Sequence, residues 1–435
     1  MPTSDSILLT LNLKEPNIHF PASCVSLEPI RGVQSLVYSG ILTYPAPDTC
    51  PVCGARHARL IRYGTKSSLI VLPKVSRMNT YLRLAKQRWR CRKCGHTSSA
   101  SSPIVAANCF ISENTKLAAI LDAKTKISQK DIANALNISH GTVNALLLKT
   151  YSSIIIRRSH LPRHLCFDEF RSVKGVCGKM SFLILDAETG AVIDLLQDRR
   201  LSQLLRYFSS YSRDARAAVQ TVCMDLYAPY AQLVHALFPK ARIIIDRFHI
   251  IQLISRALNQ TRVELMKRDR QDYRKLKRYW RLILKNQDEL DGLNFRQAPG
   301  FTRWMREVDL VSHLTHLDPV LLATYERYQQ LLHAIKDRDP DRFFKTLRQP
   351  GDELSRYMRI AIRSLLDNEA GVRNAMVYPW SNGVIEGTNN LIKVIKRIAF
   401  GYRSFVSFKI RILLIANTLV RLDIKKRGTF ICATP

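Results

Sequence analysis

The distribution of apolar and polar residues divides the chain into stretches with different expected secondary structure. Residues 1–45 alternate weakly and carry several prolines that break long elements, so we expect an N-terminal segment without chemistry of its own. Strand-like runs at 69–72 and 88–90 predict a small β-rich module. Residues 112–150 change to helical spacing, which indicates a separate helical module.

Beyond residue 163, short apolar runs alternate with turns and helical stretches, which is the pattern of a mixed α/β sheet. The strands are expected at 164–170, 180–185, 192–196, 219–224 and 242–245. Residues 249–376 instead carry only helical spacing, and a further helix is expected to start near residue 383. The sequence therefore predicts an α/β domain that is interrupted by an all-α insertion.

Composition limits the class of protein. At roughly 150 residues per domain, a chain of 435 residues and 49.8 kDa is expected to hold about three domains. Hydrophobic residues make up 46% and charged residues 23%, which argues against wholesale disorder. The 67 Lys and Arg residues outnumber the 35 Asp and Glu residues, and the net charge of +32 predicts a polyanionic partner such as DNA.

The sequence offers no membrane or export signal. No stretch approaches the roughly 18 unbroken apolar residues of a membrane span. The first residues carry no positive charge before the short apolar stretch 7–13, which argues against a signal peptide. We therefore expect a cytoplasmic protein with no membrane partner.

Four of the ten cysteines form two Cys-x-x-Cys pairs, each followed by a glycine that permits a tight turn: Cys50, Cys53, Cys91 and Cys94. Four thiolates satisfy tetrahedral Zn²⁺ and leave no position for water, so the expected zinc is structural. The pairs are 37 residues apart, more than the usual roughly 15 to 20, which predicts an inserted hairpin. His57 and His96 are alternative ligands, and two unrelated reduced pairs are the competing interpretation.

Residues 128–148 have the pattern of a helix-turn-helix. Ser128 and Asp131 are spaced as a capping box, residues 137–139 form the turn, and a second helix begins after Ser139. The outward positions of this second helix are candidates for contacts in a DNA major groove: His140, Thr142, Asn144 and Lys149. A generic amphipathic helix pair is the alternative.

Other basic residues are expected to contact DNA phosphates. The zinc-binding module has no acidic residue between 50 and 100, and the 36 residues after Glu386 are also free of acids. From these segments we select five cations as candidate DNA contacts: Arg88, Arg90, Lys393, Lys396 and Arg397.

Three acidic residues are candidates for a catalytic metal site. Asp168 interrupts an apolar strand, Asp225 ends another, and Glu386 lies in the first turn of an expected helix. Three such carboxylates can hold two Mg²⁺ ions roughly 3.5 to 4 Å apart, as phosphodiester transfer requires. Taken singly, these acids also fit strand-end caps, ion pairs or a helix-dipole acid. Asp246 and His249, at the end of the next strand, are candidates for supporting this site.

The order of the motifs FDE, MDLYAPY, DRFHI and SNGVIEGTNNLIK, after the zinc knuckles and the helix-turn-helix, resembles bacterial insertion-sequence transposases of the ISL-three type. The resemblance spans almost the whole chain. It implies that Asp168, Asp225 and Glu386 are the DDE triad of an RNase H-like α/β domain with a mixed sheet. It also implies a helical insertion before the Glu, and two Mg²⁺ ions per active site, with Mn²⁺ as a substitute.

The same resemblance implies the reaction and its setting. The expected activity is binding of the terminal inverted repeats of an insertion sequence, strand cleavage, and strand transfer into target DNA. A homodimer or higher assembly on DNA and association with the nucleoid are expected. A non-enzymatic DNA-binding repressor and a metal-dependent nuclease without joining activity are the alternatives.

The expected domains follow the chain in order. They are an N-terminal segment at 1–45, a zinc-binding domain at 46–104, a helix-turn-helix domain at 110–156, a catalytic domain at 163–250 and 378–425, and an all-helical insertion at 251–377.

Overall fold

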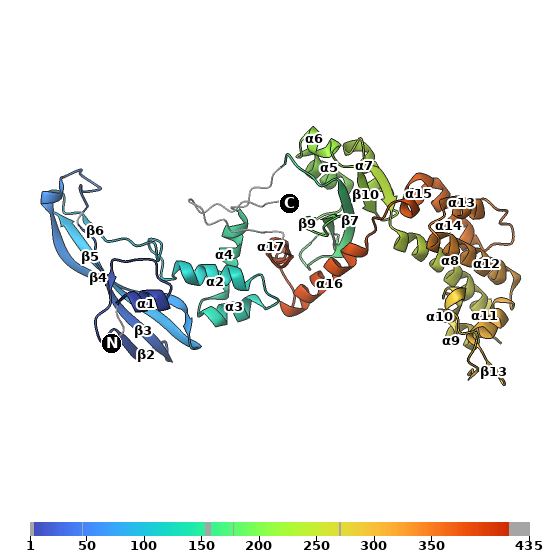
Figure 1. The fold of residues 1–435 in the computed structure, drawn as a ribbon, viewed down its shortest axis with the longest axis horizontal. Coiled ribbons are helices and arrows are strands. Elements are labelled where there is room, and N and C mark those ends of the chain that lie inside the picture. The colour runs from blue at the N-terminus through green and yellow to red at the C-terminus, as the bar shows by residue number, and fades with distance from the viewer. Residues whose placement is uncertain (1–3, 46, 153–157, 177, 269–270, 417–435) are drawn as a thin grey trace. The chain divides into compact units, whose positions relative to one another are not determined.

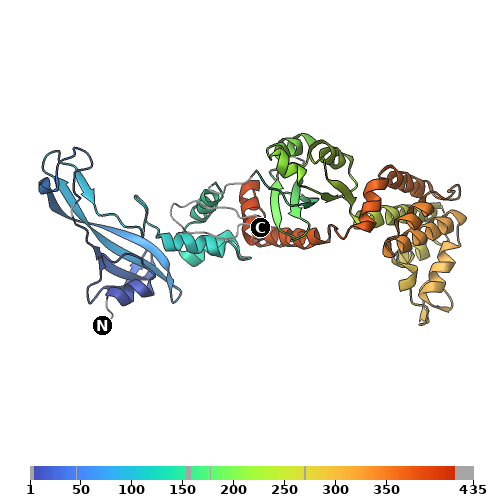
Figure 2. The ribbon, with the colours of Figure 1, turned by 45° about the horizontal axis from the view of Figure 1, so that its top comes forward.

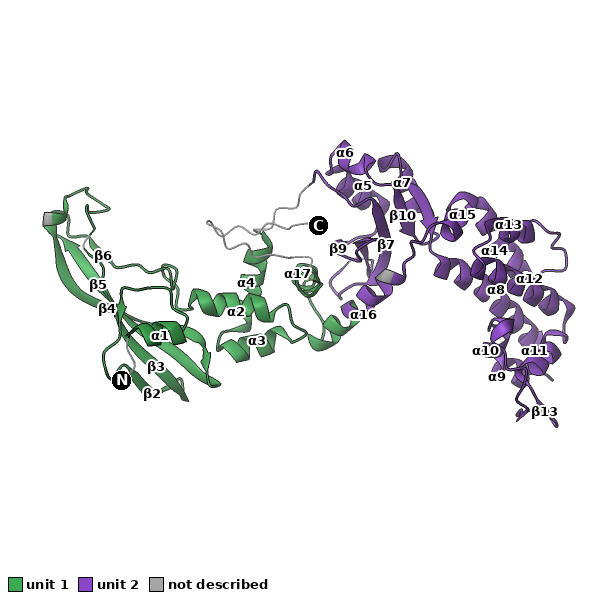
Figure 3. Ribbon diagram, in the orientation of Figure 1, with its two compact units in different colours: residues 1–155, 392–435 green, residues 156–391 purple. Residues whose placement is uncertain are grey.

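The computed structural model describes residues 4–45, 47–152, 158–176, 178–268 and 271–416 (Figure 1). The chain forms two compact units, coloured separately in Figure 3. The first consists of residues 1–155 and 392–435, and the second of residues 156–391. The C-terminal segment therefore belongs to the same unit as the N-terminal modules.

The first unit contains a six-stranded sheet with the path β1-β3-β5-β4, in which β2 pairs with β3 and β6 with β5. The strands are β1 Ile18–His19, β2 Val25–Ile30, β3 Val33–Leu42, β4 Leu60–Val75, β5 Met78–Cys91 and β6 Thr97–Ser99. Strand β3 runs parallel to β5, so residues 1–45 share one sheet with the zinc-binding residues. Helix α1 (Ser4–Thr10) adds Ile7 to the core of this sheet.

Strands β4 and β5 form a long hairpin, visible in Figure 2, and they extend well beyond the short strands predicted at 69–72 and 88–90. The hairpin turns at Ser76 and Arg77, which have φ angles of 48° and 65°. Positive φ at both central residues characterises the type I′ turn, whose twist matches that of the flanking strands. Glycine and asparagine usually occupy these positions, so Ser76 and Arg77 do not predict a turn.

Three helices of the first unit form the predicted helix-turn-helix: α2 Glu113–Asp122, α3 Gln129–Leu136 and α4 His140–Ser152. The capping box of Ser128 and Asp131 is present, and Asn137 ends α3 in the left-handed conformation with φ 54°. Ser139 caps α4 by accepting the backbone N–H of Thr142 at 3.0 Å. These local features are confirmed because they depend on residues close together in the chain.

The helical core of this module is completed by the C-terminal helix α17 (Phe405–Ile415), which lies far away in sequence. Ile410 and Leu414 pack with Ile132 and Val143 in one buried cluster. Arg411 of α17 is only 2% exposed. Its guanidinium donates to the carbonyl groups of the link between α2 and α3: Ala123, Thr125 at 3.2 Å and Ile127 at 2.6 Å.

The second unit is built on a five-stranded mixed sheet with the order β11-β10-β7-β8-β9. The strands are β7 His164–Arg171, β8 Met180–Asp186, β9 Val192–Leu196, β10 Thr221–Met224 and β11 Arg242–Ile245. Strand β10 is parallel to both β7 and β11, whereas β7, β8 and β9 are antiparallel. The predicted strands agree with these bounds within two residues, and the fold is the expected α/β, RNase H-like one.

Helices cover this sheet and bury its apolar side chains (Figure 1). They are α5 Leu201–Ser209, α6 Arg213–Ala217, α7 Ala228–Leu237, α15 Glu369–Val377 and α16 Gly383–Ile398. Phe208 of α5 and Phe238 after α7 both pack on Phe167 of β7, with ring centroids 5.4 and 6.4 Å away. Helix α15 lies so close to β11 that a Cβ atom on Gly371 would be 2.9 Å from Ile245 Cγ1.

The segment between β11 and α15 is mostly helical, as predicted. Its helices are α8 Arg247–Arg268, α9 Tyr273–Arg278, α10 Trp280–Ile283, α11 Glu307–Thr315, α12 Pro319–Lys336, α13 Pro340–Leu347 and α14 Arg356–Asp367. The expectation of helices alone was wrong at one place, where β12 (Arg296–Gln297) pairs with β13 (Trp304–Met305). Pro299 and Gly300, the latter with φ 96°, break helical geometry between them. Within the described ranges, no helix has the length and apolarity to cross a membrane.

Replacing Arg411 by Met is expected to destabilise the helix-turn-helix module by about 2–4 kcal/mol, because buried carbonyl groups lose their donor. Hydrogen exchange of the amides in α2, α3 and α4 measures this change. The control is Arg403→Met, since Arg403 precedes α17 and is exposed. Equal protection in the two variants would show that Arg411 does not support the module.

Candidate active site and zinc centre

The four paired cysteines come together in the first unit. Cys91 ends β5 and pairs with Leu60 at the start of β4, so the β4–β5 hairpin brings the second knuckle back to the first. The Sγ atoms of Cys50 and Cys94 are 3.6 Å apart, and those of Cys53 and Cys91 are 3.7 Å apart. All four sulfurs lie within 4.8 Å of one another. Zn–S bonds of about 2.3 Å in a tetrahedron require sulfur separations of about 3.8 Å, which fits this cluster.

The backbone of each knuckle forms a tight turn, and in the first knuckle backbone N–H groups stabilise the thiolate form of a cysteine. Gly54 and Gly95 have φ angles of 66° and 74°, which only glycine adopts without strain. Hydrogen bonds from the backbone N–H groups of Cys53 and Val52 lower the pKa of Cys50 to about 6. The four cysteines are thus the ligand set of a structural zinc site, and neither His57 nor His96 is needed to complete it.

Two of the three predicted catalytic acids lie side by side on the sheet of the second unit. Asp168 is in the middle of β7, and Asp225 directly follows β10. These strands are parallel neighbours, with Cys223 opposite Cys166. Extending this register by two residues places Asp225 beside Asp168, on strands about 4.8 Å apart. Both carboxylates are partly buried.

His249 and Asp246 support this pair of acids. Asp246 directly follows β11 and is 4% exposed, and His249 lies in the first turn of α8. Nδ1 of His249 is 3.0 Å from Asp225 Oδ1 and 3.2 Å from Asp246 Oδ2. The imidazole therefore bridges the two carboxylates and fixes the position of Asp225.

The start of α16 is attached to the same acids by two asparagines. Asn389 donates its Nδ2–H to Asp168 Oδ2 at 2.7 Å. Asn382, just before the helix, donates its backbone N–H to Asp246 Oδ1 at 3.1 Å, and its side-chain amide is 3.4 Å from Asp225 Oδ1. Glu386 follows Asn382 by four residues and precedes Asn389 by three, so the helical repeat places all three on one face of α16.

The acidic cluster carries more negative charge than its protein neighbours neutralise. Burial raises the pKa of Asp225 to about 7, assisted by the charges of Asp168 and Asp246, although His249 acts in the opposite direction. Burial also raises the pKa of Asp168. A hydrogen bond with Asp246 raises the pKa of His249. Such an environment favours the binding of a cation beside Asp168 and Asp225.

Glu386 differs from Asp168 and Asp225 in that no hydrogen bond or ion pair of its side chain is seen within the described ranges. Its side chain is exposed in the first turn of α16. Among the residues that the structure describes, the four cysteines are the only group of three or more potential metal ligands whose atoms lie within 4.8 Å of one another. The carboxylate oxygens of Asp168, Asp225 and Glu386 do not all lie this close together. The helix register places Glu386 on the face of α16 that carries Asn389, and no contact of Glu386 with Asp168 or Asp225 is seen among the described residues.

The candidate DNA contacts on α4 differ in accessibility. His140 and Lys149 are exposed. Thr142 is half-buried, with its hydroxyl 2.8 Å from that of Ser139. Asn144 is also half-buried, and its Oδ1 accepts the hydroxyl of Ser407 from α17 at 2.9 Å.

The other candidate cations contact aromatic rings or extend into solvent. Arg88 and Arg90 both lie over the ring of Tyr63 on β4, each 5.3 Å from its centroid. Lys396 lies 5.2 Å from the ring centroid of Phe408. Lys393 and Arg397, also on α16, are exposed.

Several residues around the acids were not predicted from the sequence. Asn382 and Asn389 lie within the SNGVIEGTNNLIK motif, and two amides flanking a helical glutamate at helix spacing were the available signal. Glu169, next to Asp168, forms an ion pair with Arg199 and accepts the hydroxyl of Tyr230. No spacing rule joins these three residues, because they lie on different elements.

The sheet, the acid cluster, the zinc ribbon and the helix-turn-helix together define a class of DNA-processing proteins built on an RNase H-like domain. Residues 165–412 match the family model DDE_Tnp_ISL3, described as "Transposase". Residues 46–94 match the zinc finger of the transposases of IS204, IS1001, IS1096 and IS1165. The chain belongs to this ISL3-type transposase family, since the first match covers more than half of it.

Two relatives extend this comparison. The transposase for insertion sequence element IS1001 of Bordetella parapertussis is 24% identical over 260 residues, which is 57% of this chain and 60% of that protein. A protein of Lactococcus lactis subsp. lactis named "ATP-dependent protease" is 37% identical over 110 residues, which is 25% of this chain and 35% of the relative. The chain thus covers less than two thirds of the length of either relative.

Replacing Cys53 by Ser is expected to abolish zinc binding, since three thiolates and a weakly binding hydroxyl do not make a closed site. Metal analysis of the purified protein should give about one zinc per chain for the wild type and none for the variant. Cys109→Ser is the matched control, because Cys109 is half-buried outside the cluster. Zinc retained by Cys53→Ser would contradict the four-cysteine site.

The raised pKa of Asp225 predicts a pH-dependent change in stability. A carboxyl with a pKa of about 7 when folded and about 4 when unfolded destabilises the protein progressively as pH rises from 4 to 7. Asp225→Asn removes this cost, so its Tm without added divalent ions should exceed that of the wild type at pH 8 but not at pH 4.5. Asp214→Asn, at an exposed position of α6, is the control.

Mg²⁺ should then raise the Tm of the wild type at pH 8 and leave that of Asp225→Asn unchanged, because ligand binding stabilises only the form that binds it. If Asp225→Asn raised the Tm above that of the wild type equally at pH 4.5 and pH 8, the ionised Asp225 carboxylate would not be the cause of the wild type's lower Tm.

Proposed function

We propose that this protein is a DNA transposase that binds the terminal inverted repeats of an insertion sequence, cleaves strands there and transfers them into target DNA. The observation that carries this proposal is the position of Asp168 and Asp225 on neighbouring parallel strands, with the start of α16 bonded to both. Glu386 is the third catalytic acid in this proposal, because it shares the face of α16 that carries Asn389.

The chemistry of the site fits Mg²⁺ or Mn²⁺. Oxygen ligands suit these hard cations, and the cluster offers carboxylates whose pKa values are raised by burial and mutual repulsion. The Oδ1 atoms of Asn382 and Asn389 are buried acceptors for which the described residues provide no donor. Two bound divalent ions would activate the attacking oxygen and stabilise the leaving oxygen of a phosphodiester.

In this proposal, the residues around the site either bind the metal ions or position the residues that bind them. Asp168, Asp225 and Glu386 hold the metal ions. His249 and Asp246 keep the Asp225 carboxylate in place through the hydrogen bonds described above. Asn389 does the same for Asp168, whose remaining lone pairs would bind a metal ion.

In this proposal, the first unit binds the ends of the element. The proposed contacts are the exposed His140 and Lys149, together with Thr142 and Asn144, on α4. Phosphate contacts are assigned to Arg88, Arg90, Lys393, Lys396 and Arg397. The proposed domain limits remain 46–104 for zinc binding, 110–156 for the helix-turn-helix, 163–250 with 378–425 for catalysis, and 251–377 for the insertion.

The proposal extends to assembly and location. Transposition joins two element ends, so the active form is a homodimer or higher assembly on DNA, associated with the nucleoid in the bacterial cytoplasm. The name of the Bordetella relative refers to an insertion sequence element, which supports a DNA substrate of this kind.

Asp168→Asn, Asp225→Asn and Glu386→Gln are each expected to lower Mg²⁺-dependent strand cleavage by at least about 10³-fold, since each removes a metal-binding charge. The assay uses labelled DNA from the ends of the element that encodes the protein and measures nicked and joined products. Binding of the same DNA should stay within about threefold of wild type, because these acids lie outside the proposed end-binding surface.

Asp214→Asn is the control for loss of an acidic residue, and it should cleave like the wild type. Full cleavage by any of the three variants would remove that residue from the site. Nicking without joining in the wild type would establish the nuclease instead, and end binding without either reaction would establish the repressor.

A further inference from the structure

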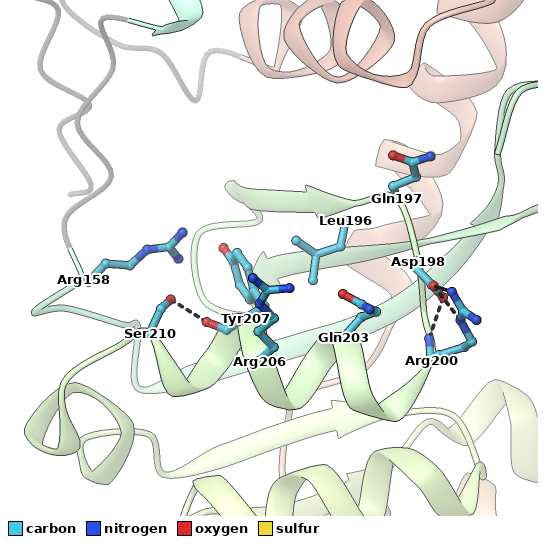
Figure 4. A pocket seen from close by; sticks show the side chains of 9 residues that line it. All are labelled: Arg158, Leu196, Gln197, Asp198, Arg200, Gln203, Arg206, Tyr207 and Ser210. Atoms are coloured by element: carbon cyan, nitrogen blue, oxygen red, sulfur yellow. Dashed lines mark hydrogen bonds and ion pairs between the residues drawn. The ribbon is translucent and has the colours of Figure 1, made fainter. Parts of the chain in front are cut away.

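A cavity of about 550 Å³ in the second unit is lined mostly by residues with polar side chains, and none of the candidate acids is among them (Figure 4). One wall is a face of α5 that carries Gln203, Arg206 and Tyr207, followed by Ser210. The link from β9 to α5 supplies the other wall, with Gln197, Asp198 and Arg200, and Arg158 closes one end. Nothing in the proposed catalytic mechanism uses this cavity.

Arg158 is held in place by aromatic rings. Its guanidinium carbon is 4.7 Å from the ring centroid of Tyr207 and 4.6 Å from that of Tyr211. Tyr207 is fixed in turn, because its hydroxyl donates to Asp194 Oδ2 at 2.9 Å. Cation–π contacts position the guanidinium without neutralising its charge.

The cavity has an excess of positive charge. Asp198 is the only acidic residue in its lining, and it forms an ion pair with Arg200. Arg158 and Arg206 have no carboxylate within ion-pair distance among the described residues, and Nη1 of Arg158 is buried without an acceptor there. A buried donor of this kind is costly unless a ligand supplies the acceptor.

The basic groups are spread along α5 rather than gathered at one point. Arg200 precedes the helix, Arg206 lies in its last turn, and Arg158 lies near Tyr211 beyond its end (Figure 4). At 1.5 Å per residue, positions 200 to 210 span about 15 Å. With 3.4 Å per nucleotide of one strand, this length matches about four backbone phosphates.

The link that forms one wall of the cavity also reaches the acid cluster. Arg199, between two lining residues, forms an ion pair with Glu169, and Glu169 follows Asp168 on β7. The guanidinium of Arg199 also lies 5.5 Å from the ring centroid of Tyr227, two residues after Asp225. A strand bound along α5 would therefore continue towards the catalytic end of the sheet.

We propose that this cavity is a groove for the sugar-phosphate backbone of a DNA strand, with Arg158 and Arg206 as its phosphate contacts. The inference rests on the proposed function, which brings a DNA strand to Asp168 and Asp225. The occupant is a polymer backbone rather than a free phosphate ion, because the positive groups form an extended row.

The test uses the full-length protein and a fluorescent single-stranded oligothymidylate of about 20 nucleotides, with binding followed by anisotropy over a range of KCl concentrations. Arg206→Ala should weaken binding about threefold to tenfold at low salt and reduce the slope of log K against log salt by about 0.7, the value for one phosphate contact. Arg158→Ala should act in the same direction.

Lys240→Ala is the control, since Lys240 is exposed in the loop before β11, at the opposite edge of the sheet. It should bind with wild-type affinity and slope. Because Arg206 is exposed, its replacement preserves the fold, and an equal effect of Arg206→Ala and Lys240→Ala would overturn the proposal. Displacement of the oligonucleotide by about 1 mM inorganic phosphate at constant ionic strength would identify a small-anion site and overturn it as well.

These outcomes are separable from those of the cleavage assay. Asp225→Asn should lose cleavage without losing affinity for the oligothymidylate, because removing a negative charge does not weaken the binding of phosphates. The acid variants could still cleave while Arg206→Ala binds the oligothymidylate more weakly and with a smaller salt dependence. In that case the assignment of the catalytic acids would be wrong, and the proposed groove would be supported.

Discussion

The parallel pairing of β7 with β10 is the constraint on which the candidate active site depends. It places Asp168 and Asp225 next to each other and buries both partly, although two neighbouring carboxylates repel each other. The apolar residues of both strands make this pairing favourable, since they bury a continuous core with helices α5 and α7. The free energy of that core offsets the cost of holding the acids together, and a divalent ion would remove much of the cost.

Helix α16 gives the acid cluster its third side and also connects the two units. Its first residues bond to Asp246, Asp225 and Asp168 through two asparagines, and its last residues belong to the first unit. The chain then continues into α17, which completes the core of the helix-turn-helix through Ile410 and Leu414. The core of the helix-turn-helix module therefore includes residues from the segment that follows Glu386.

Metal ions and arginines serve different purposes in two modules of the first unit. The four thiolates of the zinc ribbon hold together the end of the hairpin, where only the small cluster of Ala55, Leu60 and Trp89 packs around the buried cysteines. In the helical module, Arg411 satisfies carbonyl groups that no helix can pair. In both places a few polar contacts fix the geometry of segments that come from distant parts of the chain.

The sequence by itself determined the features that depend on neighbouring residues: the cysteine knuckles, the capping box of Ser128, and the five strands that carry or flank Asp168 and Asp225. Periodicity and spacing act over a few residues, so these predictions needed no partner. Only the tertiary structure decided that α17 joins the helix-turn-helix, that residues 1–45 share a sheet with β5, and that Asn382 and Asn389 hold the acids. These contacts join residues dozens to hundreds of positions apart, and no local pattern records which distant surfaces will pack together.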